Sequence, residues 1–71
     1  MLEWTPTPQS SNIARVGYDT ETQELVVEFK SGGTYAYDGV SANTAADLAS
    51  DPSPGGYFSR HVRNRYQSRR L

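Results

Sequence analysis

One stretch near the middle of the chain strongly restricts what the chain can fold into. Leu25, Val27 and Phe29 alternate with other residues, and this period-two pattern is typical of a strand that buries one face. Residues 31–33, Ser-Gly-Gly, follow at once, and glycine tolerates the positive φ that short hairpin loops require. Residues 34–37 can then return as the antiparallel partner. The sequence therefore predicts a β-hairpin at the centre of the domain.

A similar alternation precedes this hairpin. Ala14, Val16 and Tyr18 alternate with polar or small residues, and residues 19–22 supply a turn. The predicted sheet is a three-stranded antiparallel meander over about residues 12–18, 24–30 and 33–38.

Two short helices are predicted after the sheet. Ser41 is a suitable N-cap for a helix near residues 42–50, in which Ala45, Leu48 and Ala49 form the buried stripe. Ser53, with its hydroxyl as cap, and the proline after it repeat this start signal for a helix near residues 54–64. Strands first and helices after them indicate an α+β domain with both helices packed on one sheet face. The predicted core residues are Leu25, Val27, Phe29, Leu48, Phe58 and Val62.

The two ends of the chain are expected to lie outside this domain. Residues 1–9 are rich in proline and threonine and lack periodicity, so we expect an extended lead-in whose Trp4 either stays loose or docks on a partner. A second helix that continued to the end would turn arginines onto its apolar side, which argues for a stop near Asn64. The predicted domain covers residues 10–66, and residues 67–71 form a basic tail.

Charge is sorted strongly along the chain. Residues 1–58 contain two basic and eight acidic residues, a formal charge of −6, whereas residues 59–71 contain five arginines and carry +5. Arginine is the cation best shaped for bidentate contact with phosphate, whereas lysine is the ordinary solubilising cation. Three interpretations of these arginines stay open: phosphate or nucleic acid, ion pairs with the acidic sheet of the same or a second copy, and a protein partner.

The start of the second helix is the first candidate site. The first N–H groups of a helix lack helical partners and carry partial positive charge, and glycines allow a phosphate to approach them closely. Two arginines are expected on the outer side of the same helix. The predicted phosphate- or nucleic-acid-binding residues are Ser53, Gly55, Gly56, Arg60 and Arg63. The alternative is that the serine only caps the helix and the glycines only allow it to pack.

Tyrosines are the second candidate. Tyr35 and Tyr37 lie two residues apart and therefore share one face of a strand. On the helix-covered face they would belong to the core, and on the open face they would form a platform for nucleobases. The sequence does not fix the hairpin register, so both possibilities stay open. The stacking candidates are Tyr35, Tyr37 and Tyr57.

Other chemistries find little support in the composition. The chain has no cysteine and only His61 as histidine, so we expect no disulfide, no metal, no cofactor and no enzymatic activity. No apolar run approaches the roughly 20 residues that span a bilayer, and the start lacks the features of a signal peptide. We therefore expect a soluble, cytoplasmic protein. With only 71 residues, its core is small, and we expect self-association as a dimer or higher oligomer.

Several short pieces of the sequence occur together in a distinctive order. They are SSNI at residues 10–13, VGYD at 16–19, LVVEF at 25–29, GTYAY at 33–37, GV at 39–40, SPGGYF at 53–58 and HVR at 61–63. Together these pieces, over about residues 10–66, resemble the KTSC domain, a family named for its occurrence at the C-terminus of some lysyl-tRNA synthetases. It also occurs as small stand-alone proteins in bacteria and phages.

The resemblance implies RNA binding, which has been suggested for the family, and it implies no catalytic residues. Together with the arginines and tyrosines, it leads us to expect a non-enzymatic binding module for phosphate-bearing ligands, with RNA as partner. Two alternatives remain: an oligomeric protein that sequesters a small or cyclic nucleotide, and a protein-interaction adaptor.

Overall fold

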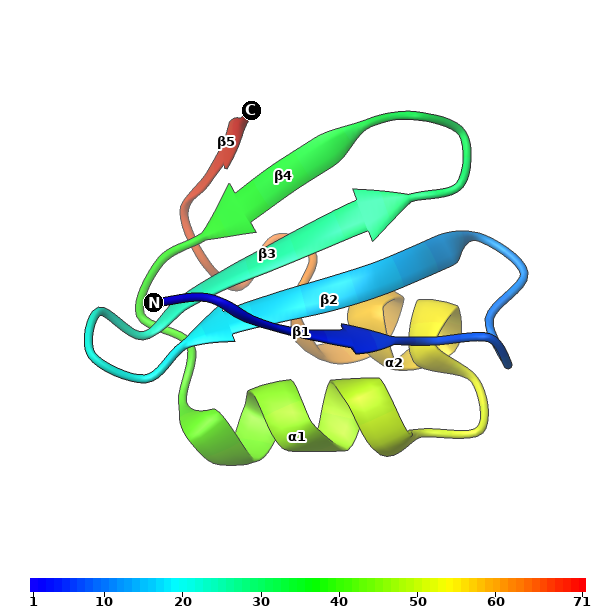
Figure 1. Cartoon of the computed structure of the whole chain (residues 1–71), viewed down its shortest axis with the longest axis horizontal. Coiled ribbons are helices and arrows are strands. Elements are labelled where there is room, and N and C mark those ends of the chain that lie inside the picture. Colours follow the sequence, from blue (N-terminus) through cyan, green and yellow to red (C-terminus); the bar gives the residue numbers. More distant parts are fainter.

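The computed structural model describes all residues, 1–71, as a five-stranded antiparallel sheet with two helices on one face (Figure 1). The strands lie side by side in chain order. The elements are β1 (Glu3–Pro6), β2 (Ile13–Asp19), β3 (Glu24–Phe29), β4 (Thr34–Tyr37), α1 (Ala42–Ser50), α2 (Pro54–His61) and β5 (Ser68–Arg70). The α+β class and the central three-stranded meander are confirmed. We call the sheet surface opposite the helices the open face.

The prediction of only three strands is wrong, because both ends of the chain add an edge strand. β1 pairs with β2, with Trp4 opposite Gly17, and β5 pairs with β4, with Arg69 opposite Ala36. The expected loose lead-in and basic tail are therefore parts of the sheet. Every residue in both edge strands is exposed, so no apolar alternation marks them in the sequence. Proline in the first is compatible with an edge position.

The core lies between the sheet and the two helices. Most of the predicted core residues are buried, and Phe29 is half-buried against them. Burial of each large aliphatic or aromatic side chain contributes roughly 1.5–3 kcal/mol. The buried core cluster consists of Ile13, Val16, Leu25, Val27, Tyr37, Val40, Ala45, Leu48, Phe58 and Val62.

The register of the central hairpin decides which face the two strand tyrosines take. Tyr37 lies opposite Leu25, and Tyr35 lies opposite Val27. Directly opposed residues of an antiparallel pair share one face, and both partners here are fully buried. The tyrosines therefore lie on the helix-covered face, not on the open one.

The two helices begin differently. The Ser41 hydroxyl accepts a hydrogen bond from the Thr44 N–H and so caps α1, as predicted. The predicted cap of α2 is wrong: the Ser53 hydroxyl caps nothing. Its backbone lies at φ −130° and ψ 78°, and its N–H donates to the Asp51 carboxylate at 2.8 Å. The hydroxyl lies beside Gly56 in the first turn but accepts no helix N–H.

After α2 the chain reverses direction and returns to the sheet as β5. The helix ends at His61, three residues earlier than predicted, and the N–H groups of Val62 and Arg63 both donate to the Phe58 carbonyl. Asn64 then adopts φ +66°, the left-handed conformation predicted for the residue that stops the helix. Neither helix is long and apolar enough to cross a membrane.

Candidate functional site

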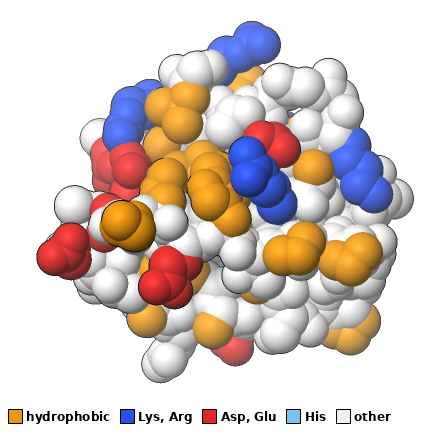
Figure 2. Space-filling model, viewed as in Figure 1, with side chains coloured by type: hydrophobic (Ala, Val, Ile, Leu, Met, Phe, Trp, Pro, Cys, Tyr) orange, Lys and Arg blue, Asp and Glu red, His pale blue; other side chains and the backbone are white.

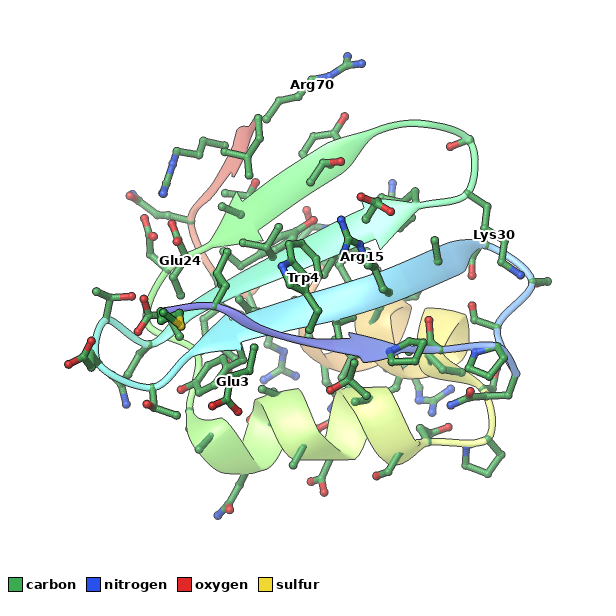
Figure 3. All side chains as sticks on the ribbon, viewed as in Figure 1. Glu3, Trp4, Arg15, Glu24, Lys30 and Arg70 are labelled. Carbon is green, nitrogen blue, oxygen red and sulfur yellow. The ribbon has the colours of Figure 1, made fainter.

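On the open face, an arginine is stacked on the only tryptophan. Gly17 lets the Trp4 ring lie flat on β2, because a Cβ there would meet ring atoms at 3.0–3.2 Å. The Arg15 guanidinium carbon lies 3.9 Å from the ring centroid, and its Nε donates to Glu28 at 3.2 Å. Figure 3 shows Arg15 above Trp4 at the centre of this face. The stack fastens β1 to the sheet and satisfies the charge of Arg15.

Arg69 is held in a similar way at the other side of the same face. Its guanidinium donates to Asp38 at 3.0 Å and to Glu24. The hydrogen bond to Asp38, followed by that to Glu24, raises the pKa of Arg69. In Figure 2, basic and acidic side chains stand beside one another around hydrophobic atoms in the middle of this face. Intramolecular pairing, one of the three interpretations of the arginines, thus describes Arg69.

Four arginines have no acidic partner within the chain. All four are exposed, and all lie between the middle of α2 and the end of β5. They are Arg60, Arg63, Arg65 and Arg70. The positive charge of these four side chains is therefore not neutralised by ion pairs within the chain.

A hollow of about 440 Å³ opens between α2 and the β4–β5 side of the sheet. Four aromatic side chains line it, together with Arg63 and several polar residues, and we call it the aromatic hollow. Phe29 contacts Tyr35 and Phe58 edge to face at centroid distances of 6.0 and 5.4 Å, and Tyr37 contacts Phe58 at 5.5 Å. Such pairs favour fixed ring positions, so the wall of the hollow is pre-formed.

The hydroxyl of Tyr37 is the unusual group in this wall. Only 6% of the residue is exposed, yet the hydroxyl has no hydrogen-bond partner in the chain. No buried side-chain polar atom lacks a partner, so this hydroxyl must reach the opening of the hollow that Tyr37 lines. Burial, with a smaller effect from Tyr35, raises the pKa of Tyr37, while Arg63 opposes the shift. The hydroxyl is therefore a protonated, unused donor at neutral pH.

A second hollow, of about 380 Å³, lies at the start of α2 and has no apolar lining, so we call it the polar hollow. Ser53, Gly55 and Gly56 line it. A Cβ on Gly55 would overlap the side-chain oxygen of Asn12, so this glycine serves close packing. A Cβ on Gly56 would lie 3.2 Å from an Arg60 terminal nitrogen, which places that guanidinium over the first turn.

The structure divides the predicted site residues among three places. Ser53, Gly55, Gly56 and Arg60 gather at the polar hollow, whereas Tyr35, Tyr37 and Arg63 border the aromatic hollow. Asn12 and Ser59 line both hollows and so connect them.

Tyr57 lies apart from both hollows. Its ring packs against that of His61, with centroids 4.6 Å apart and planes tilted by 44°. Burial, followed by the charge of Asp47 in α1, raises the pKa of Tyr57. The side chain thus faces the α1 side of α2, and the structure does not bring it together with the other candidates.

Sequence reasoning missed three residues of this region. Asn64 and Ser68 line the aromatic hollow, and Arg70 lies opposite Tyr35 across the β4–β5 ladder. The Arg70 guanidinium carbon is 6.0 Å from the Tyr35 ring centroid. Only the pairing of β5 brings Ser68 and Arg70 to the hollow, and no local pattern predicts that pairing. For Asn64, the left-handed conformation was predicted but not the direction of the side chain.

Known proteins similar to this chain include both long and short ones. A lysine–tRNA ligase of Nostoc punctiforme is 33% identical over 64 residues, which are 90% of this chain and 11% of the ligase. An uncharacterized protein of Stutzerimonas stutzeri is 40% identical over 52 residues, 73% of each chain. The chain therefore spans about a tenth of the length of the ligases that it matches.

The fold and the family agree. The crystal structure of the KTSC domain protein YPO2434 from Yersinia pestis matches with a TM-score of 0.93 and 28% identity, over 100% of this chain and 99% of that one. That match includes both edge strands. The family model described as the KTSC domain matches residues 9–66. The chain therefore belongs to the KTSC domain family.

Proposed function

We propose that this protein is a non-enzymatic binding module for phosphate-bearing ligands and that its partner is RNA. One observation carries the proposal: Arg60, Arg63, Arg65 and Arg70 have no acidic partner, although the rest of the chain carries an excess of acid. Exposed arginines with free planar forks are well suited to phosphate oxygens.

The aromatic hollow favours RNA over duplex DNA. Sequence-specific RNA binding commonly uses unstacked bases that contact aromatic side chains and arginine planes. Arg63 lines the hollow with Tyr35 and Tyr37, and the Arg70 guanidinium lies 6.0 Å from the Tyr35 ring, so phosphate and base contacts are available close together. The lysine–tRNA ligases that contain a similar segment act on an RNA, as their name states, which agrees with this proposal.

The acidic remainder of the chain limits the footprint. Residues 1–58 carry a formal charge of −6, and a long polyanion that wrapped the domain would meet this surface. We therefore expect a short footprint of a few nucleotides at the end of the molecule that carries the free arginines.

The proposal is tested by titration of a short single-stranded oligoribonucleotide at several salt concentrations. The double variant R60A/R63A is expected to bind more weakly, and its salt slope should fall by about 1.4 units if each arginine contacts one phosphate of the single strand. The control is R15Q, which removes one positive charge from the open face. Equal affinity and equal salt slope for wild type and R60A/R63A would contradict the proposal.

A second candidate is an oligomer that sequesters a small or cyclic nucleotide. The volume of the aromatic hollow, about 440 Å³, lies within the range of roughly 300–1,000 Å³ usual for small-molecule sites. Native mass spectrometry of freshly purified protein distinguishes the candidates. A nucleotide mass on a defined oligomer supports sequestration, and bare protein that shifts with RNA supports the first proposal. Bare protein that shifts with neither leaves the protein-interaction adaptor.

A further inference from the structure

The aromatic hollow contains a hydrogen-bond donor that the fold itself does not use. Tyr37 is 6% exposed, and its hydroxyl has no partner in the chain although the hollow is otherwise rich in polar groups. A nearly buried tyrosine normally pairs its hydroxyl within the protein. Here the hydroxyl reaches the opening of the hollow instead, so it is available to water or to a ligand.

A second polar group of the same hollow is also free. The Asn64 amide makes no hydrogen bond within the chain, and its backbone at φ +66° holds it where the chain turns from α2 towards β5. An amide offers both donors and an acceptor, as the edges of nucleobases do. Asn64 and Tyr37 thus present unpaired polar atoms at an aromatic wall.

Two free arginines flank this arrangement. Arg63 lines the hollow, and its charge acts on the Tyr37 hydroxyl. Arg70 stands on the same sheet face as Tyr35, with its guanidinium 6.0 Å from that ring. Figure 3 shows Arg70 projecting beyond the edge of the sheet.

On the basis of the proposed function, we propose that the aromatic hollow receives a single unstacked nucleobase of an RNA strand. The base contacts the wall formed by Tyr35 and Phe58, and the Tyr37 hydroxyl and the Asn64 amide bind its edge. Arg63 and Arg70 bind the phosphates on either side of that nucleotide.

This arrangement selects single strands. A base in a helix is stacked on both faces and paired at its edge, so it cannot enter a hollow behind a sheet without being extruded, which costs a few kcal/mol. A perfectly paired hairpin of the same length and charge should therefore bind more weakly than the open strand, although it offers the same phosphates. A single-stranded oligomer that is abasic at every position should also bind more weakly, because it keeps the phosphates and lacks the bases.

Two conservative variants test the base contacts. Y37F removes only the free hydroxyl, and N64G removes the amide while tolerating the left-handed backbone. Each is expected to weaken binding of single-stranded RNA about three- to tenfold, the loss typical of one hydrogen bond. The matched control is Y66F, because Tyr66 is half-buried but lines neither hollow. Thermal unfolding of each variant checks that the fold is intact; Y37F should unfold at the wild-type temperature or above, because its hydroxyl has no internal partner.

The outcomes separate this inference from the proposed function. If R60A/R63A weakens RNA binding but Y37F and N64G do not, the base pocket is wrong and phosphate binding stands. Equal affinity for the open strand, the paired hairpin and the abasic strand would likewise overturn the base pocket alone. If the wild-type protein binds none of these RNAs, both proposals fail together.

Discussion

Arg69 and Arg70 are adjacent in the sequence, but their side chains lie on opposite faces of the sheet. Both belong to β5, but successive residues of a strand point to opposite faces. Arg69 lies on the open face, where Asp38 and Glu24 bind it. Arg70 lies on the helix-covered face beside Tyr35 and has no acidic partner. One side chain completes the sheet, and its neighbour remains free for a ligand.

The same division extends over the whole molecule. On the open face, the charges of Arg15 and Arg69 are matched by carboxylates, and the arginines hold the two edge strands. Around the two hollows, the arginines have no carboxylates, and Tyr37 keeps an unused hydroxyl. A basic segment in a sequence therefore contains ion-paired and unpaired arginines side by side, and only strand pairing separates them.

The largest expected effect comes from removing free arginines. R63Q/R70Q should lower the affinity for single-stranded RNA about 30- to 100-fold, because two phosphate contacts disappear together. The unfolding temperature should stay close to wild type, since neither side chain has a partner in the fold. Fluorescence anisotropy with labelled RNA and thermal unfolding measure the two quantities.

R69Q provides the matched comparison for that double variant. It removes a neighbouring charge from the same strand but from the open face, so affinity should change far less than in R63Q/R70Q. If R69Q lost as much affinity as R70Q alone, the division of the arginines into structural and binding groups would be wrong.

The next largest effect concerns the open face. G17V places side-chain carbon where the Trp4 ring now lies, at 3.0–3.2 Å, so Trp4 must leave and β1 must loosen. We expect a loss of about 1–2 kcal/mol in unfolding free energy, in the lower part of the range for overpacking, because β1 is exposed and can move away. Denaturant unfolding measures this loss. RNA affinity should be unchanged for the folded protein, and a large loss of affinity would mean that the open face takes part in binding.

The central part of the fold could be predicted because its pattern is local. Alternation in β3, the glycine loop after it and Ser41 as helix cap each depend on a few neighbouring residues, and all three appear in the structure. The edge strands could not be predicted in this way. Trp4 is fixed by Gly17 and Arg15, which are distant in the sequence, and β5 follows from a chain reversal at Asn64.

The candidate site was predictable in its chemistry but not in its grouping. Arginine clustering and paired tyrosines point to the region, but Arg60 lies against Gly56 at the helix start, whereas Arg63 lines the aromatic hollow. In the sequence, the two glycines at the helix start indicate room for a phosphate, but Gly55 is needed for close packing against Asn12. Hairpin register, which decides the face of Tyr37, depends on long-range packing.

A smaller effect is expected from the paired arginine itself. R69A removes the ion pairs with Asp38 and Glu24. Arg69 and both carboxylates are partly solvent-exposed, so water and salt screen these ion pairs. We expect a slight fall in unfolding temperature at low salt that disappears at high salt. A loss that persists at high salt would mean that Arg69 stabilises β5 by packing of its aliphatic chain instead of by charge.

The smallest effect should appear only in alkaline solution, and it tests whether the Tyr37 hydroxyl is shielded from water in the folded protein. Burial raises the pKa of Tyr37 in the folded protein above its ordinary value of 10.0. Above that ordinary value the unfolded chain has lost the proton while the folded one still holds it, so stability falls as pH rises through the folded pKa. Below pH 10 the contribution of this pKa shift to the unfolding free energy is complete and constant.

Y37F should lose less stability than wild type as pH rises above 10, measured by denaturant unfolding, with Y66F as the control. If wild type and Y37F declined equally, burial would not raise the pKa of Tyr37, and the partly shielded hydroxyl from which the base pocket is argued would be contradicted.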